Sequence, residues 1–247
     1  MAIISCEPPF QCYPPSMKIL LFGATGMVGQ GVLRECLLDP EVSAVLSVGR
    51  SALGKSHPKL QELVRADLFS YEGLDAELAG WDACFFCLGV SSAGMPEVAY
   101  RRVTFDLTLA AAAPLARLNP GMTFTYVSGQ GTDSSEQGRV LWARVKGATE
   151  NALLGLPFRA AAMFRPGMIE PVHGVVSKTP LYQVPYTLFG PLVTLLRRLF
   201  PNQIVTTEEL GWAMLEVARF GPPKPVLETR DIRALVTAAL ARKGTRA

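Results

Sequence analysis

The sequence predicts an α/β protein: a doubly wound parallel sheet, with a small substrate or lid lobe toward the C-terminus. Apolar, strand-like runs alternate with helical periods along most of the chain, which is typical of parallel sheets covered by helices. A glycine-rich turn joins the first strand to the first helix. The chain has 247 residues, 49% hydrophobic and 18% charged, which is enough to bury one large core.

The first strand and helix enclose the most informative stretch. The apolar run 19–22 ends at Gly23, and Gly26 and Gly29 complete a G-x-x-G-x-x-G pattern as a helical period begins. Gly23 lets the chain leave the strand, Gly26 lets backbone approach a pyrophosphate, and Gly29 lets the helix pack closely. The free N–H groups of the helix N-terminus favour phosphate. An ordinary βα turn is the alternative, but the strand–turn–helix context favours a dinucleotide site. Its predicted contacts are Gly23, Thr25, Gly26, Met27, Val28 and Gly29.

The later elements follow in alternation. Strands are expected at 42–48, 63–66, 83–88, 122–127 and 158–164, and helices at 96–118, 139–154, 207–220 and 231–242. Pro114 predicts a kink in the helix 96–118, and 206–209 reads as a capping box. Residues 1–16 are expected to be a disordered leader before a single domain, 17–247. Prolines and aromatic residues cluster after Glu170, so 171–205 and the C-terminal helices are expected to form the small lobe.

Cofactor preference should appear at the end of the second strand, which reads Val48-Gly49-Arg50-Ser51. No acid is present to hold a ribose 2′-OH, which would mark NAD. Arg50 can pair with a 2′-phosphate and Ser51 can add a hydroxyl, so NADP(H) is favoured over NAD(H). A solvated loop arginine is the alternative. Asp67 could accept from an adenine amino group, or cap a helix instead.

Several other functions find little support. Cys84 and Cys87 form a C-x-x-C inside an apolar strand, where residues three apart point to opposite faces, so buried thiols are favoured over redox or metal chemistry. The two histidines lack partners at metal-ligand spacing. A net charge of +3 with scattered basic residues does not indicate nucleic acid. The N-terminus lacks the basic and apolar regions of a signal peptide, and prolines and arginines interrupt 181–200, so no membrane span and a cytoplasmic location are expected.

An ordered set of short motifs resembles the short-chain dehydrogenase/reductases. The motifs are Gly23 to Gly29, Ala66-Asp67-Leu68, Cys87-Leu88-Gly89, Tyr126-Val127-Ser128, Lys146 and Arg165-Pro166-Gly167. Their spacing is similar to the atypical or extended branch, with its TIP30-like and nucleoside-diphosphate-sugar epimerase-like proteins. The resemblance covers about 18–171 and implies an NAD(P)-binding Rossmann fold. It also implies cofactor contacts from Asp67, Leu68, Leu88, Gly89, Lys146, Pro166 and Gly167.

The same resemblance implies catalytic roles, with one departure. Ser128 matches the serine that hydrogen-bonds the substrate oxygen, and Lys146 matches the lysine that holds the nicotinamide ribose. The family's catalytic tyrosine lies four residues before that lysine, where this chain has Trp142. An indole N–H does not titrate usefully and cannot act as the general acid. Lys146, a bound water or another tyrosine could supply the proton; the tyrosines considered are Tyr100, Tyr126 and Tyr182. Trp142 as a packing aromatic and Lys146 as a surface lysine are the alternatives.

Two classes of function therefore stay open. One is an NADP-dependent oxidoreductase or epimerase acting on a small carbonyl or sugar-nucleotide type of substrate. The other is a non-catalytic NADP(H)-binding sensor or scaffold, which the missing tyrosine favours. A homodimer or a protein partner is compatible with either class, and the sequence does not identify the substrate.

Overall fold

A parallel sheet forms the middle of the molecule. The computed structural model describes residues 16–175 and 203–245. Within them the main sheet has seven strands in the order β3-β2-β1-β4-β5-β6-β9, and every neighbouring pair is parallel. The strands are β1 (Met17–Phe22), β2 (Val42–Gly49), β3 (Leu60–Val64), β4 (Ala83–Phe86), β5 (Thr123–Val127), β6 (Ala160–Arg165) and β9 (Val226–Glu228). The strand order reverses at β1, as in a doubly wound fold.

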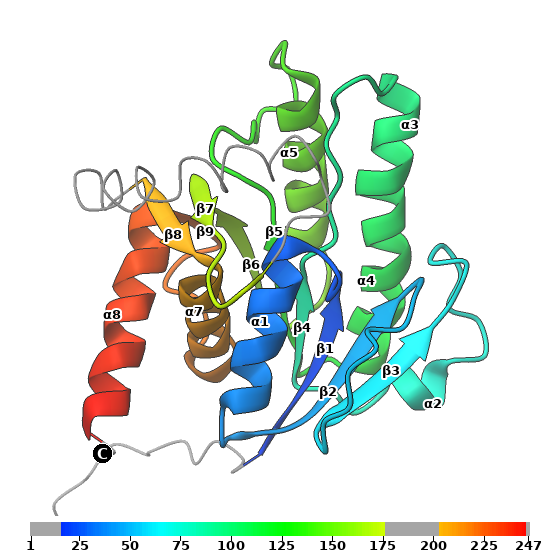
Figure 1. The fold of residues 1–247 in the computed structure, drawn as a ribbon. Coiled ribbons are helices and arrows are strands. Elements are labelled where there is room, and N and C mark those ends of the chain that lie inside the picture. The colour runs from blue at the N-terminus through cyan, green and yellow to red at the C-terminus, as the bar shows by residue number, and fades with distance from the viewer. Residues whose placement is uncertain (1–15, 176–202, 246–247) are drawn as a thin grey trace, which may run out of the picture.

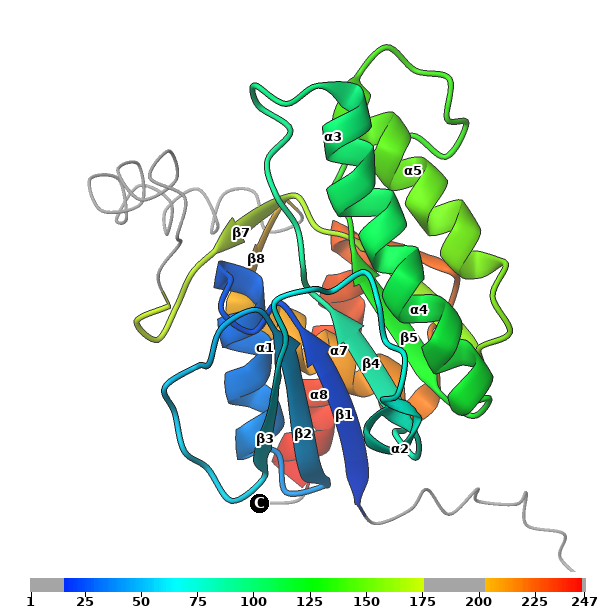
Figure 2. The same ribbon diagram turned by 90° about the vertical axis from the view of Figure 1, so that its right-hand side faces the viewer.

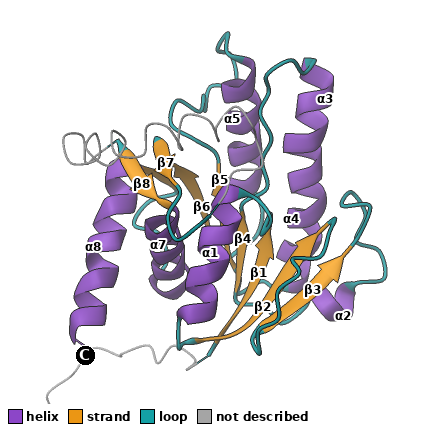
Figure 3. Cartoon of the chain, viewed as in Figure 1, coloured by secondary structure: helices purple, strands orange, loops and turns teal. Residues whose placement is uncertain are grey.

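Helices cover both faces of this sheet (Figures 1 and 2). One face carries α1 (Met27–Leu38), α7 (Thr207–Phe220) and α8 (Thr229–Thr245). The other carries α2 (Asp75–Leu78), α4 (Leu107–Leu118) and α5 (Leu141–Leu154), with α3 (Glu97–Arg101) leading into α4 through the π-helical segment η1 (Arg102–Asp106). Figure 3 shows the strands of the main sheet between the two groups of helices, with β7 and β8 apart from them. The predicted Rossmann-like α/β fold is confirmed.

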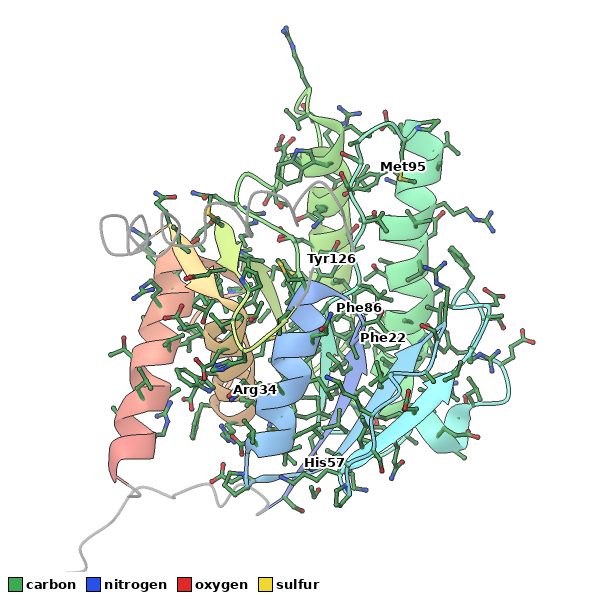
Figure 4. All side chains as sticks on the ribbon, in the orientation of Figure 1. Phe22, Arg34, His57, Phe86, Met95 and Tyr126 are labelled. Carbon is green, nitrogen blue, oxygen red and sulfur yellow. The ribbon has the colours of Figure 1, made fainter. Side chains whose placement is uncertain are left out.

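Alternating side chains along each strand build two cores. Ile19 and Leu21 of β1 face α1 and α7, whereas Leu20 and Phe22 face the α4 side. On that second side Phe22 stacks on Phe86 with ring centroids 5.1 Å apart (Figure 4). Alternation also separates the C-x-x-C thiols. Cys84 lies in the α4-side core and Cys87 packs on the opposite one, as the strand geometry predicts.

Helix α7 confirms the predicted capping box. The Thr206 hydroxyl accepts from the Glu209 N–H at 3.0 Å, and the Glu209 carboxylate accepts from the Thr206 N–H at 2.8 Å. The helix lies close to α1: a Cβ built on Gly31 would stand 2.5 Å from the Thr207 Cβ. Buried residues of α7 and α8 also share one core with the strands on this face of the sheet.

Other boundaries differ from the prediction. The third strand spans Leu60–Val64 rather than 63–66, because its exposed polar residues Gln61 and Glu62 hide the start of the strand in the sequence. The predicted helix 96–118 contains η1. Strand β9 and the two-stranded sheet of β7 (Met168–Glu170) and β8 (Ile204–Thr206) are three-residue strands without a readable period.

Parts of the predicted domain division cannot be compared with the structure. Residues 1–15 of the leader and 176–202 of the lobe lie outside the described residues. The division into a domain and a small lobe therefore stays a prediction. In the described ranges no helix has the length and apolar character needed to cross a membrane.

Candidate functional site

The glycine turn lies at the point where the strand order reverses. Gly23 follows β1 with φ +82°, and a Cβ there would stand 2.7 Å from the Cys87 carbonyl carbon and the Leu88 nitrogen. The turns after β1 and β4 thus touch through backbone, and only glycine fits at this position. In open α/β sheets ligands bind in the crevice outside the carboxyl ends at such a point.

The N-terminus of α1 opens on this crevice. Gly26 is the N-cap residue, no side chain caps the helix, and its first turn holds no acid. A Cβ on Gly29 would stand 2.1 Å from the Gly23 carbonyl oxygen, so Gly29 is what lets the helix pack on the turn. Gln30 fixes the loop by donating to the Thr25 carbonyl at 3.1 Å. The N–H groups of the first turn, which includes Met27 and Val28, are left to a ligand.

Further along this edge, the ends of β2 and β3 lie together. Arg50 and Ser51 are exposed beyond β2, and the Arg65 N–H donates to the Gly49 carbonyl at 2.9 Å. Arg65, which the sequence reasoning missed, carries a buried Nε without a hydrogen-bond partner. Asp67 accepts from the Phe69 N–H at 2.8 Å in a local turn. The next helix, α2, begins only at Asp75, so Asp67 does not cap a helix. Leu68 is buried, and Leu88 and Gly89 follow β4 at the same edge.

Ser128 and Lys146 are brought together, as the resemblance implies. Ser128 follows β5 and is 7% exposed. Its carbonyl oxygen accepts from Lys146 Nζ at 2.5 Å. Its hydroxyl lies 2.5 Å from Glu150 Oε1 and 3.1 Å from the Phe164 carbonyl oxygen, both buried acceptors. The hydroxyl proton is therefore directed inward.

Trp142 belongs to α5 and lies one helical turn before Lys146. Its indole packs on the loop that follows Ser128. A Cβ on Gly131 would stand 3.6 Å from the indole, and one on Gly129 would stand 3.9 Å from it. The ring thus covers the 129–131 backbone, which matches its reading as a packing aromatic.

A buried ion pair supports these residues. Glu150 is 0% exposed, and Arg165 Nε lies 3.1 Å from each of its oxygens. Arg165 also donates to the Ser134 hydroxyl at 2.6 Å and lies 3.5 Å from Glu228. The bonds to Glu150 raise the pKa of Arg165. Burial lowers the pKa of Lys146 to about 8, although the Glu150 charge opposes that shift.

Sequence reasoning missed Glu150 altogether and quoted Arg165 only as part of a motif. One signal was present: Trp142, Lys146 and Glu150 recur every four residues, which puts them on one face of α5.

The tyrosines considered as proton donors lie elsewhere. Tyr100 and Tyr126 are each 1% exposed, and burial raises the pKa of both phenols. Figure 4 shows Tyr126 in a row with Phe86 and Phe22, and its ring centroid is 6.0 Å from that of Phe86. Tyr182 lies outside the described residues. Neither described phenol is placed to reach a substrate.

The turn after β6 completes the edge. The Gln130 N–H donates to the Pro166 carbonyl and the Gly167 N–H donates to Thr229 Oγ1, each at 2.9 Å. A Cβ on Gly167 would stand 2.5 Å from the Gln203 carbonyl oxygen. Pro166 and Gly167 are thus held against the loop that follows Ser128.

Comparison with known proteins agrees with this arrangement, although no protein-family profile matches the chain. Among curated proteins, the chain is 31% identical over 153 residues to the mitochondrial protein fmp52-2 of Aspergillus oryzae, covering 60% of this chain and 66% of that protein. It is 29% identical over 155 residues to HTATIP2 of Rattus norvegicus, covering 62% of each. These matches span less than two thirds of either relative.

Solved structures share the fold. A short-chain dehydrogenase/reductase family oxidoreductase from Burkholderia thailandensis has a TM-score of 0.59 at 16% identity, covering 95% of this chain and 99% of that one. The Bordetella bronchiseptica enzyme WbmF in complex with NAD⁺ has a TM-score of 0.61 at 15% identity, covering 94% and 79%. The chain thus shares the fold of the short-chain dehydrogenase/reductase superfamily. Its curated relatives fit the atypical branch of that superfamily.

The cytoplasmic location predicted from the sequence is wrong by the same comparison. The fungal relatives, from Aspergillus oryzae, Aspergillus terreus and Chaetomium globosum, are named mitochondrial. The prediction rested on the lack of a secretory signal and of a spanning helix. Neither observation distinguishes the cytoplasm from the mitochondrion.

Proposed function

We propose that this protein is a short-chain dehydrogenase/reductase that binds NADP(H) and acts as an oxidoreductase or epimerase on a small carbonyl or sugar-nucleotide type of substrate. The observation that carries the proposal is the glycine turn at the strand-order reversal, with the uncapped N-terminus of α1 facing the crevice. The fold shared with short-chain dehydrogenase/reductases and the NAD⁺ complex of WbmF support a nicotinamide cofactor.

The residues at the sheet edge fit such a cofactor in order. The turn from Gly23 to Gly29 would hold the pyrophosphate. Arg50 and Ser51 would hold a 2′-phosphate, and Asp67, Leu68, Leu88 and Gly89 the adenosine. Lys146, Pro166 and Gly167 would hold the nicotinamide riboside. When bound, the nicotinamide supplies or accepts hydride.

In this proposal Lys146 supplies the proton to the substrate oxygen. Its pKa of about 8 leaves both protonation states populated near neutral pH, as general acid–base catalysis requires. The Ser128 hydroxyl donates to Glu150, so toward a substrate it offers an acceptor and would orient a substrate hydroxyl. Trp142 shapes the pocket wall above the 129–131 loop.

A non-catalytic NADP(H)-binding sensor or scaffold is the second candidate. It is favoured by Trp142, which stands where the superfamily resemblance places the tyrosine general acid. In that case the cofactor would bind with normal affinity and no carbonyl would be turned over.

Replacing Trp142 by tyrosine separates the two candidates. The phenol would sit one turn from Lys146, whose ammonium favours the phenolate and lowers the phenol pKa. General acid catalysis typically contributes about 10²–10⁴-fold. We therefore expect slow NADPH oxidation by the parent with ketones, quinones and sugar nucleotides, and a large gain in Trp142→Tyr.

The absorbance of NADPH is the readout, and Trp142→Phe is the matched control because it keeps an aromatic ring without the hydroxyl. A gain in the phenylalanine variant as large as in Trp142→Tyr would show that pocket size, not proton donation, limits turnover. No turnover in any of the three, with NADPH bound, would favour the sensor or scaffold.

A further inference from the structure

A fully buried carboxylate lies directly beneath the candidate site. Glu150 of α5 is 0% exposed, and its oxygens contact the Ser128 hydroxyl and the Arg165 guanidinium. Burying a charge is costly unless it is paired and hydrogen-bonded, and here both conditions are met. Arg165 alone would neutralise the carboxylate, yet Glu150 also accepts a hydrogen bond from the hydroxyl of Ser128, which lies at the edge of the candidate site.

Ser128 is held at both ends by successive turns of one helix. Lys146 Nζ donates to the Ser128 carbonyl oxygen at 2.5 Å, and Glu150, four residues on, accepts from the Ser128 hydroxyl. The bond from the Ser128 N–H to the Phe164 carbonyl, 2.9 Å, fixes the backbone between them. Lys146, Ser128 and Glu150 thus form one hydrogen-bonded frame, in which Glu150 is fully buried.

The charges around this frame come from several elements. Arg165 of β6 neutralises Glu150, and Glu228 of β9 contacts Arg165 from the far side. Tyr126 of β5 and Tyr100 of α3 are buried nearby and un-ionised at neutral pH. Glu150 is the anion that acts on Lys146 in this arrangement, against the effect of burial.

We propose that Glu150 is a positioning residue of the site, whose buried carboxylate fixes the Ser128 hydroxyl and holds the Lys146 ammonium in the arrangement that the reaction uses. Its meaning for catalysis rests on the proposed function. The effect on Lys146 is a property of the protein without cofactor and can be measured separately.

The test follows the titration of Lys146 by NMR of lysine labelled with ¹³C at Cε, with the signal assigned from Lys146→Arg. Glu150→Gln keeps the shape of the side chain and removes its charge. We expect Lys146 to titrate at a lower pH than in the parent, because the opposing anion is gone. Glu228→Gln is the matched control: it removes another carboxylate that contacts Arg165 without touching Ser128, and Lys146 should titrate as in the parent.

Glu150→Gln leaves the Arg165 charge buried without its main partner, which is destabilising. The double variant Glu150→Gln, Arg165→Met removes both charges and keeps the measurement available if the single variant unfolds. It should shift the Lys146 titration in the same direction but by less, because loss of the Arg165 cation opposes the loss of the Glu150 anion. An unchanged Lys146 titration in the folded variants would overturn the proposal and make Glu150 a structural partner of Arg165 only.

The proposed function and the role of Glu150 can fail separately. Failure of NADPH to bind the parent would contradict the proposed function and leave the Lys146 titration untouched. An unchanged titration alongside tight NADPH binding would contradict only the role of Glu150.

Discussion

Arg50 is the residue on which cofactor preference depends. It is exposed at the carboxyl end of β2, where an acid would hold the 2′-OH of NAD. A guanidinium can clamp a 2′-phosphate with two charge-assisted bonds. NADPH should therefore bind more tightly than NADH in calorimetric titrations, and Arg50→Ala should weaken NADPH about 10- to 100-fold while sparing NADH.

Arg117 provides the control for this prediction. It is an exposed arginine at the end of α4, where it pairs with Asp75. Arg117→Ala should leave both affinities unchanged. Equal binding of NADPH and NADH by the parent would refute the role given to Arg50.

Residue-level reasoning from the sequence reached part of this site. The neighbourhood of Ser128 and Lys146 was predicted from the family resemblance, which matches both residues to one catalytic site. The inward turn of the Ser128 hydroxyl was not, because it depends on Glu150 and Arg165, whose contact joins α5 to β6. No local sequence pattern predicts that Glu150 pairs with Arg165.

The α1 turn is the element that should bind pyrophosphate. Gly26 has φ −81°, which any residue adopts, and a Cβ there would stand 3.3 Å from the Gly23 carbonyl oxygen. Gly26→Val should therefore fold, judged by circular dichroism, but should lose NADPH binding because the side chain fills the phosphate path. Gly121→Val is the control, since nothing lies within 4 Å of its Cβ position. Retained NADPH binding in Gly26→Val would mean that the turn is only structural.

Elements with a strong pattern were predicted well. Strands β1, β2 and β5 are largely apolar runs between turn residues. The start of α7 is marked in the sequence by a capping box. The strands β7, β8 and β9 were missed because three residues are too few to show a period. Their pairing is set by tertiary contacts, as in β9 beside β6.

At the scale of the whole molecule, the fold is confirmed and the chemistry is proposed. Alternation of strands and helices sufficed for the fold, because a parallel sheet needs a crossover helix between its strands. The location was predicted wrongly, because the lack of a secretory signal and of a spanning helix does not distinguish the cytoplasm from the mitochondrion. The central claim is that the crevice at the strand-order reversal holds NADP(H), with its nicotinamide end at Lys146.

A crystal structure of the protein with NADPH tests that claim most directly. The account predicts pyrophosphate oxygens within hydrogen-bond distance of the N–H groups at the start of α1, a 2′-phosphate at Arg50, and the nicotinamide ribose at Lys146. Cofactor bound away from the Gly23 to Gly29 turn, or with its nicotinamide remote from Lys146 and Ser128, would contradict it.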